Sequence, residues 1–130
     1  TACRALGVRS LLHQADLREP AAARGLIEAV VAAWGGIDLL INLTSIYRRT
    51  PLVGLTDQDS RDLLASNLEA PYWVAVAAAQ QMLTQPIVEG LRGKILHFTD
   101  WAVDRPYPYF LPYMVAKGGV VTLTKALAVE

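Results

Sequence analysis

The sequence has 130 residues, of which 53% are hydrophobic, and its twelve basic and twelve acidic residues cancel. This length supports one modest hydrophobic core, and the hydrophobic fraction excludes a disordered chain. The balanced charge excludes the basic surface of a nucleic-acid-binding protein, and no apolar run is long enough to cross a bilayer. We therefore expect a soluble protein that has neither nucleic acid nor a membrane as a partner.

The single cysteine, Cys3, cannot form an internal disulfide and fits a reducing compartment, so we expect a cytoplasmic protein. The sequence begins at Thr1 without an initiator methionine or a signal-peptide pattern, and we interpret it as a fragment of a longer chain. His13 and His97 lie outside any cluster of Cys or Glu residues. They are therefore interpreted as core or surface histidines, and no metal site is expected.

Apolar runs and helical patterns alternate in the first half of the sequence. Residues 8–13 form a short apolar run that predicts a strand. Pro20 in a first turn, with Gly35 after the last turn, predicts a helix between them. Residues 37–43 form a nearly continuous apolar run, which predicts a strand buried on both faces, as parallel strands are.

The middle of the sequence predicts two helices. Thr56 and Asp59 resemble a capping box, with Asp in place of the usual Glu, and predict a helix from about Asp57. Pro71 predicts a break or kink before a second, alanine-rich helix that runs to about Thr84. Its small residues, together with Gly118, are explained either by contacts between subunits or by helix propensity.

Residues 94–99 predict a third strand, residues 100–112 an irregular loop, and the chain from Tyr113 onward a helix. Strands that alternate with helices indicate right-handed βαβ units. The predicted fold class is α/β, with a three-layer, doubly wound parallel sheet of the Rossmann type. Because ligands bind at the carboxyl ends of such strands, the sequence selects three places: residues 16–17, residues 42–47 and the segment from residue 100.

Tyr113 and Lys117 are the strongest chemical signal in the sequence. Four residues apart, they lie on one face of the predicted helix, one turn from each other. A tyrosine beside an ammonium group can act as a proton donor, because the positive charge lowers its pKa by favouring the phenolate. Taken alone, the pair is also explained by a half-buried tyrosine beside a solvated lysine.

Five motifs in order resemble those of the short-chain dehydrogenase/reductase family. They are residues 16–17 (Asp-Leu), 36–42 (Gly-Ile-Asp-Leu-Leu-Ile-Asn), 66–68 (Ser-Asn-Leu), 94–99 (Lys-Ile-Leu-His-Phe-Thr) and 113–117 (Tyr-Met-Val-Ala-Lys). The resemblance covers essentially the whole chain. It implies that residues 1–130 are the central part of a single NAD(P)-binding Rossmann-fold domain of an oxidoreductase.

The resemblance also assigns roles to individual residues. The implied catalytic residues are Asn67, Asp100, Tyr113 and Lys117. The implied cofactor-binding residues are Asp16, Leu17, Asn42, Thr44, Tyr113 and Lys117. The implied substrate-binding residues are Ser45, Tyr47 and Asp100.

The family's mechanism would make Tyr113 the proton donor. Lys117 would hold the cofactor ribose and lower the pKa of Tyr113, and Asn67 would hold a water that relays protons to Lys117. The glycine-rich phosphate loop and the residue that separates NADPH from NADH fall outside the sequence, and NADP(H) is expected ahead of NAD(H). We expect a small-molecule substrate and a homodimer or homotetramer.

Two features of the sequence resemble one branch of the family, the pteridine reductases and similar dihydrofolate-type reductases. Thirteen residues before Tyr113, where the family has a catalytic serine, the sequence has Asp100, as this branch does. Tyr47, followed by Thr-Pro-Leu at residues 50–52, stands where the branch has an aromatic residue that stacks on a pterin. The resemblance implies hydride transfer to a C=N bond of a pterin or dihydrofolate-like substrate.

Two alternatives remain open. One is a family member that acts on an alcohol or ketone and tolerates Asp100, and the other is a non-catalytic homologue that binds a dinucleotide. The turn at residues 42–45, Asn-Leu-Thr-Ser, keeps only the first residue of the family's Asn-Asn-Ala-Gly motif. Tyr47 also has an ordinary interpretation as a packing residue.

Overall fold

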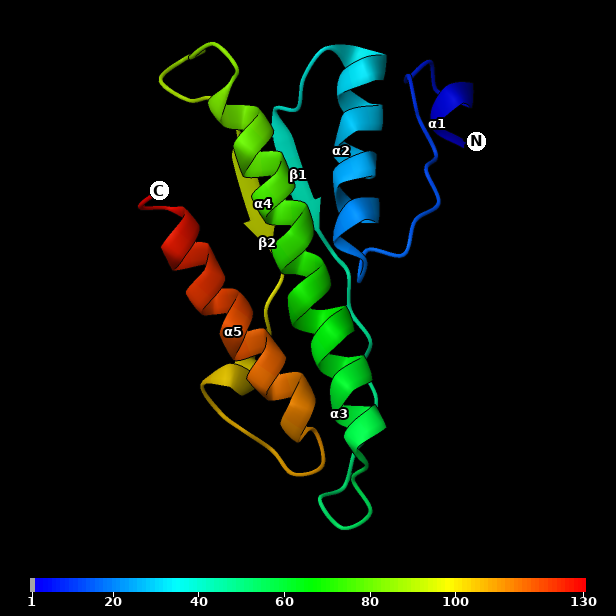
Figure 1. Cartoon of the computed structure of the whole chain (residues 1–130), viewed down its shortest axis with the longest axis vertical. Coiled ribbons are helices and arrows are strands. Elements are labelled where there is room, and N and C mark those ends of the chain that lie inside the picture. The colour runs from blue at the N-terminus through cyan, green and yellow to red at the C-terminus, as the bar shows by residue number, and fades with distance from the viewer. Residues whose placement is uncertain (1) are drawn as a thin grey trace.

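Two short parallel strands, β1 (Leu39–Asn42) and β2 (Lys94–His97), form the sheet in the computed structural model, which describes residues 2–130. Their register pairs Leu39 with Lys94 and Asn42 with His97. The other elements are α1 (Ala2–Ala5), α2 (Pro20–Trp34), α3 (Asp57–Leu64), the π-helical turn η1 (Ala65–Glu69), α4 (Ala70–Leu83), the 3₁₀ turn η2 (Trp101–Val103) and α5 (Leu111–Leu127). Figure 1 shows how they are arranged. The predicted α/β fold with a parallel sheet is confirmed.

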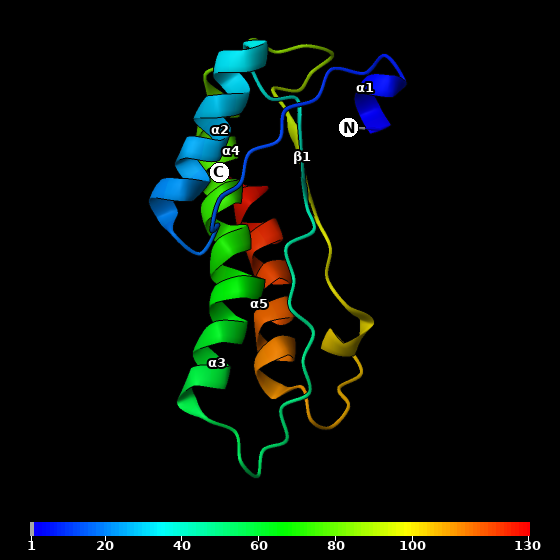
Figure 2. The same cartoon turned by 90° about the vertical axis from the view of Figure 1, so that its right-hand side faces the viewer.

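The long helices cover one face of the sheet. Figure 2 shows β1 and β2 on one side of the molecule and α2, α4 and α5 on the other. Leu40 and Ile95 pack against the helices, whereas Leu39 and Ile41 point to the opposite face and are 46% and 49% exposed. The prediction that residues 37–43 are buried on both faces is therefore wrong for this chain, because the long helices α2, α4 and α5 lie on one side of the strands.

The hydrophobic core lies between α2, α4 and the sheet. Small alanines allow α2 and α4 to approach closely, and Ala75 and Ala78 are fully buried inside the chain. An interpretation of these two alanines as subunit contacts is therefore wrong. The core cluster consists of Ala23, Ile27, Ile37, Val74, Ala77, Ala78 and Met82.

The helices α3 and α4 are joined by η1 rather than by a loop. At the start of α3, the Thr56 side chain accepts a hydrogen bond from the backbone N–H of Asp59, and the Asp59 carboxylate accepts from Thr56, so the predicted capping box is confirmed. Pro71 has no backbone N–H and its ring would clash with the carbonyl of Asn67 in a regular α-helix. The π-helical winding of η1 lies just before it, where the N–H of Ala70 reaches back to the carbonyl of Ala65. The predicted break at Pro71 is thus a local widening of one continuous helix.

Residues 8–13 do not form the predicted strand. They are irregular, and the sheet of the described residues consists of β1 and β2 alone. A strand exists only where a neighbour completes its hydrogen bonds, and in the Rossmann order 3-2-1-4-5-6 the third and fourth strands are not neighbours. If residues 8–13 correspond to the third strand and β1 to the fourth, no described strand can pair with residues 8–13.

The C-terminal helix begins two residues earlier than the sequence predicts. α5 starts at Leu111, which places Pro112 in its first turn, where proline is favoured. The predicted irregular loop of residues 100–112 contains the short turn η2, which Asp100 caps. Over residues 2–130, none of the helices has the length and apolar character that a membrane span requires.

Candidate active site

The predicted site residues gather mainly where β1 and β2 end. The chain leaves β1 through residues 43–56 and leaves β2 through residues 98–110 (Figure 1). Tyr47 of the first segment contacts Tyr113, and the Phe98 carbonyl of the second accepts from Lys117, so both segments lie beside the N-terminal half of α5. A backbone bridge between Thr50 and Phe110 joins the two segments. This is the edge of a parallel sheet at which ligands bind.

Asp100 and Tyr113 are in direct contact. The Tyr113 hydroxyl donates a hydrogen bond of 2.7 Å to the Asp100 carboxylate, and Tyr113 is only 5% exposed. Asp100 also accepts a hydrogen bond of 2.9 Å from the backbone N–H of Ala102, as the cap of η2. The carboxylate is therefore held at a fixed position against the phenol.

These contacts move the two pKa values apart. The N–H of Ala102 and then the Tyr113 hydroxyl hold the pKa of Asp100 below its ordinary value. Burial, followed by the hydrogen bond and negative charge of Asp100, raises the pKa of Tyr113. The expectation that Lys117 lowers the pKa of Tyr113 is thus not met in this chain, because the adjacent carboxylate and burial act in the opposite direction.

Lys117 lies one turn after Tyr113 on α5 and is also buried. Its ammonium Nζ donates a hydrogen bond of 2.9 Å to the carbonyl of Phe98, directly after β2. The same Nζ lies 5.8 Å from the centroid of the Tyr113 ring. Burial lowers the pKa of Lys117, and the negative charge of Asp100 partly opposes this effect. The structure thus brings Asp100, Tyr113 and Lys117 together.

Asn67, in η1, joins the helix to the segment after β1 through side-chain hydrogen bonds. Its Oδ1 accepts hydrogen bonds from the Ser45 hydroxyl at 2.9 Å and from the Ile46 N–H at 2.8 Å. Its Nδ2 donates to the carbonyls of Ile46 and Leu63. All four hydrogen-bonding positions of the side chain are used. The side chain therefore positions Ser45 and Ile46, and a water relay at Asn67 would have to use its backbone.

Asn42 and Thr44 form a tight turn at the end of β1. The Asn42 Oδ1 accepts a hydrogen bond of 3.2 Å from the Thr44 N–H. The Asn42 Nδ2 is buried and has no hydrogen-bond partner among the described residues. A buried N–H donor without an acceptor costs free energy of folding. Such a donor indicates that a bound molecule or an internal water accepts its hydrogen bond.

Aromatic side chains form one wall of the site, which we call the aromatic wall. The ring of Tyr47 stacks on Phe110 at 4.6 Å, and its edge meets Tyr113 at 5.1 Å. The hydroxyls of Tyr47 and Tyr107 lie 3.1 Å apart, and this hydrogen bond raises the pKa of Tyr107 to about 12. Tyr47 remains 59% exposed, so it still offers surface to a ligand. The wall consists of Tyr47, Trp101, Tyr107 and Phe110.

The sequence did not single out Phe110 and Tyr107 as site residues. The high density of aromatic residues just before Tyr113 was the signal that could have found them. The backbone of this segment is constrained, because Tyr109 has a φ of 78° and its carbonyl accepts a hydrogen bond of 2.6 Å from the Thr50 N–H. The Arg49 guanidinium lies 4.1 Å above the Tyr109 ring. Arg49 thus helps to join the two segments.

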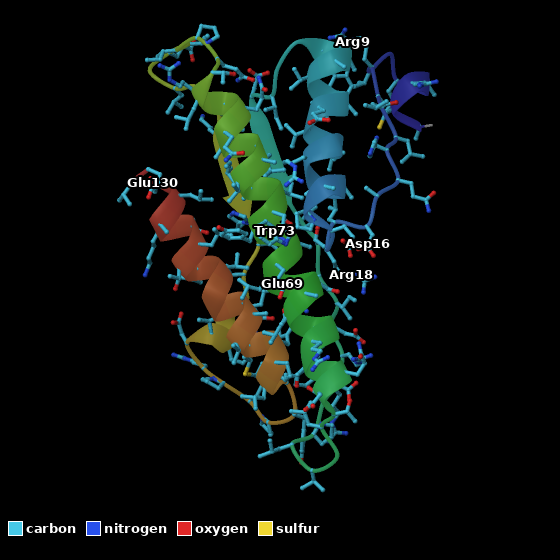
Figure 3. All side chains as sticks on the ribbon, viewed as in Figure 1. Arg9, Asp16, Arg18, Glu69, Trp73 and Glu130 are labelled. Atoms are coloured by element: carbon cyan, nitrogen blue, oxygen red, sulfur yellow. The ribbon has the colours of Figure 1, made fainter. Side chains whose placement is uncertain are left out.

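The predicted adenine-contacting pair, Asp16 and Leu17, lies at the N-terminal end of α2. Figure 3 shows Asp16 beside Arg18 there, and the two side chains form an ion pair of 2.5 Å. The hydrogen bonds from Arg18 lower the pKa of Asp16 to about 2. Leu17 packs against the hydrophobic core. The carboxylate of Asp16 is thus bound to Arg18, and the structure joins neither residue to the group around Tyr113.

The residues at the strand ends fit the nicotinamide and ribose end of a dinucleotide. Lys117 uses one of its three N–H donors on Phe98, which leaves two donors, so at least one can reach a ribose hydroxyl. The buried Nδ2 of Asn42 is a further donor at the same edge of the sheet. No glycine-rich G-x-G-x-x-G motif, which would hold the pyrophosphate, occurs in the 130 residues.

Comparisons with known proteins show the family of the chain. The family model described as short chain dehydrogenase matches residues 1–130. Gluconate 5-dehydrogenase of Gluconobacter oxydans is 31% identical over 124 residues, which cover 95% of this chain and 46% of the relative. A 3-oxoacyl-acyl-carrier-protein reductase of Staphylococcus aureus is 29% identical over 127 residues, which cover 98% of this chain and 50% of that protein.

Solved structures show the same fold. A short chain dehydrogenase of Burkholderia cenocepacia in complex with NADP matches with a TM-score of 0.85 and 31% identity, over 98% of this chain and 49% of the other. An NAD⁺-bound xylitol dehydrogenase matches with a TM-score of 0.86 and 26% identity, over 97% of this chain and 47% of the other. The predicted Rossmann-type fold is confirmed for a central portion. The chain spans about half the length of the relatives that it matches.

Proposed function

Because the chain belongs to the short-chain dehydrogenase family, we propose that residues 1–130 form the central part of one longer NAD(P)-binding domain that reduces a small molecule. The hydrogen bond of 2.7 Å between Tyr113 and Asp100, one helical turn from the buried Lys117, carries this proposal. Tyr113 would be the proton donor, Asp100 the group that orients it, and Lys117 the cation. All three lie at one edge of a parallel sheet. The proposed cofactor is NADP(H) ahead of NAD(H).

The residues of the chain would divide the reaction between them. When bound, the reduced nicotinamide supplies a hydride. Tyr113 stays protonated at neutral pH, because its pKa is raised, and it donates the hydroxyl proton to the substrate atom that becomes negative. The hydroxyl has one hydrogen, which it donates to Asp100 in this structure, so the hydroxyl would rotate this hydrogen toward the substrate for the step. Lys117, Asn42 and Thr44 would hold the ribose and the nicotinamide.

We propose a pterin or dihydrofolate-like ring as the substrate. The aromatic wall supports this choice, because an aromatic pair contributes about 0.5–1.5 kcal/mol beyond burial of area. Asp100 supports it as well, since a carboxylate accepts hydrogen bonds from an amino-pyrimidine edge, each worth roughly 1.5–3 kcal/mol. Together these contacts would favour a pterin over a simple ketone by about 30-fold or more.

A ketone or alcohol substrate is the second candidate, and the relatives favour it. Gluconate 5-dehydrogenase and the solved xylitol dehydrogenase are named for polyhydroxylated substrates. Reduction of a carbonyl would use the same proton from Tyr113. Asp100, in place of the family's serine, is the feature that separates the two candidates. A non-catalytic, dinucleotide-binding role remains the alternative if neither class is reduced.

The test compares substrate classes in the complete domain that contains this chain. Dihydrobiopterin, dihydrofolate and a panel of ketones and keto sugars are assayed with NADPH and with NADH. Asp100→Ser is expected to reduce kcat/KM for the pterin about tenfold or more and to change ketone reduction less. Tyr47→Ala is expected to raise KM for the pterin and to leave the affinity for NADPH unchanged. Tyr72→Ala, at an exposed tyrosine on α4, is the control.

The outcomes separate the candidates. Reduction of ketones alone, or pterin reduction that Asp100→Ser leaves untouched, would show that the pterin proposal is wrong. Binding of NADPH or NADH with no turnover of any substrate would support the non-catalytic role.

A further inference from the structure

Three buried nitrogen atoms without partners belong to two paired residues at the ends of the strands. They are the Nδ2 of Asn42 and the two ring nitrogens of His97, and none has a hydrogen-bond partner within the described residues. Asn42 and His97 are register partners at the carboxyl ends of β1 and β2. Partners in a parallel sheet project to the same face, here the one that the helices cover. The two side chains therefore meet between the sheet and the helices.

Lys117 reaches the same place from α5. Its Nζ donates to the carbonyl of Phe98, the residue directly after His97. Lys117 and His97 also interact electrostatically, since burial and then the charge of Lys117 lower the pKa of His97. His97 is therefore a neutral imidazole near neutral pH, with one nitrogen as donor and one as acceptor.

One small molecule between these three side chains would accept hydrogen bonds from their donors and donate one to their acceptor. The Asn42 amide and the Lys117 ammonium are donors, and the imidazole offers an acceptor. A buried water makes about three hydrogen bonds to such groups. We propose that Asn42 and His97 hold an internal water between the ends of β1 and β2, and that His97, through this water, positions the Lys117 ammonium.

This water would fix the direction of Lys117. One N–H of its ammonium is bound to Phe98, a second would be bound to the water, and the third remains for the cofactor ribose. His97 is then a positioning residue that acts through Lys117 and does not contact the substrate. This role rests on the proposed reductase function, whereas the water site itself does not.

The kinetic test uses two substitutions of His97 in the complete domain. His97→Leu removes both ring nitrogens, and we expect kcat to fall about tenfold, with a smaller change in KM for the substrate, because Lys117 loses its orientation. His97→Asn retains a donor and an acceptor, and we expect it to keep kcat within about threefold of the wild type. Ile95→Val, on the same face of β2, is the control and should leave kcat within about twofold.

The opposite result has a clear physical meaning. If the ring nitrogens had no partner at all, replacement by leucine would be neutral or stabilising and would leave kcat unchanged. A His97→Leu variant with a raised Tm and wild-type kcat would therefore overturn the proposal. So would an equal loss of kcat in His97→Leu and His97→Asn variants that both stay folded.

A crystal structure of the complete domain tests the water site without any variant and without any activity. We expect electron density for a water within hydrogen-bonding distance of the Asn42 Nδ2 and of a ring nitrogen of His97. Direct contact of these atoms with another protein group, with no water between them, would overturn the proposal. A domain that reduces nothing but shows this water would contradict the proposed function alone.

Discussion

At the scale of single residues, the contact between Tyr113 and Asp100 determines the protonation state of both side chains. A carboxylate that accepts from a buried phenol stabilises the protonated phenol, so the pKa of Tyr113 is raised and that of Asp100 is lowered. Tyr113 is thus held in its protonated form, and the raised pKa also makes it a weaker acid than a free tyrosine.

Substitution of Asp100 by serine should therefore lower the pKa of Tyr113. The change removes the negative charge and leaves a neutral hydroxyl, so the phenolate becomes less unfavourable. The measurement is a pH titration of phenolate absorbance, with Tyr113→Phe used to assign the signal. Asp104→Ser, at an exposed aspartate after η2, is the matched control and should not move it. Ionisation of Tyr113 at the same pH with and without Asp100 would contradict this explanation.

The sequence predicted the residues of the site better than their contacts. Tyr113 and Lys117 follow from helix periodicity, because residues four apart share a face. The hydrogen bonds of Asn67 to Ser45 and Ile46 join segments about twenty residues apart, so no local pattern encodes them. The lowered pKa expected for Tyr113 was wrong because the position of the Asp100 carboxylate is a tertiary feature.

At the scale of elements, α5 packs closely against η1, and one glycine permits this approach. A Cβ at Gly119 would lie 2.7 Å from the Leu68 side chain, whereas a Cβ at the adjacent Gly118 would lie 3.9 Å from Val103. Leu68 and the buried Asn67 are neighbours in η1. The distance between α5 and η1 therefore also sets the distance between Tyr113 and the segment that Asn67 holds.

Alanine at these two glycines should have opposite effects. Gly118→Ala should stabilise the domain by up to about 1 kcal/mol, because alanine is the better helix former. Gly119→Ala should lose this gain and destabilise the domain by about 1 kcal/mol or more, because Leu68 must move in a packed interface. Chemical denaturation measures both free energies of unfolding. Equal effects of the two substitutions would show that the close approach at Gly119 does not affect the free energy of unfolding.

Element types were predictable where a signal was local. The capping box of Thr56 and Asp59 and the helix between Pro20 and Gly35 depend on neighbouring residues, and both are confirmed. The strand predicted for residues 8–13 depends on a partner that these residues cannot specify. The π-helical turn before Pro71 was predicted only as a kink, because a proline does not by itself specify how the preceding turn widens.

At the scale of the whole molecule, the proposed dinucleotide site would lie only partly on this chain. The residues that fit a nicotinamide ribose are Asn42 and Lys117, whereas a glycine-rich loop for the pyrophosphate is not found in the sequence. The relatives are about twice as long as this chain. The exposed apolar face of β1, with Leu39 and Ile41, is consistent with further packing partners in a complete domain.

The 130-residue chain alone should therefore bind NADPH poorly. A helix N-terminus behind a glycine-rich loop normally holds the pyrophosphate, and ribose contacts alone do not replace it. Isothermal titration calorimetry of the isolated chain, with the complete domain as the control, measures the difference. Micromolar binding of NADPH by the isolated chain would contradict this account of how the cofactor is held.

The most direct measurement is cofactor-dependent turnover by the complete domain with Tyr113 replaced by phenylalanine. Phe keeps the ring against Tyr47 and removes only the hydroxyl that Asp100 orients. Tyr109→Phe is the matched control, since the ring under Arg49 is retained. We predict that Tyr113→Phe lowers kcat by about 10²- to 10⁴-fold and leaves the Kd for NADPH nearly unchanged, whereas Tyr109→Phe keeps wild-type kcat. A Tyr113→Phe variant that retains half of the wild-type kcat would contradict the assignment of Tyr113 as the proton donor.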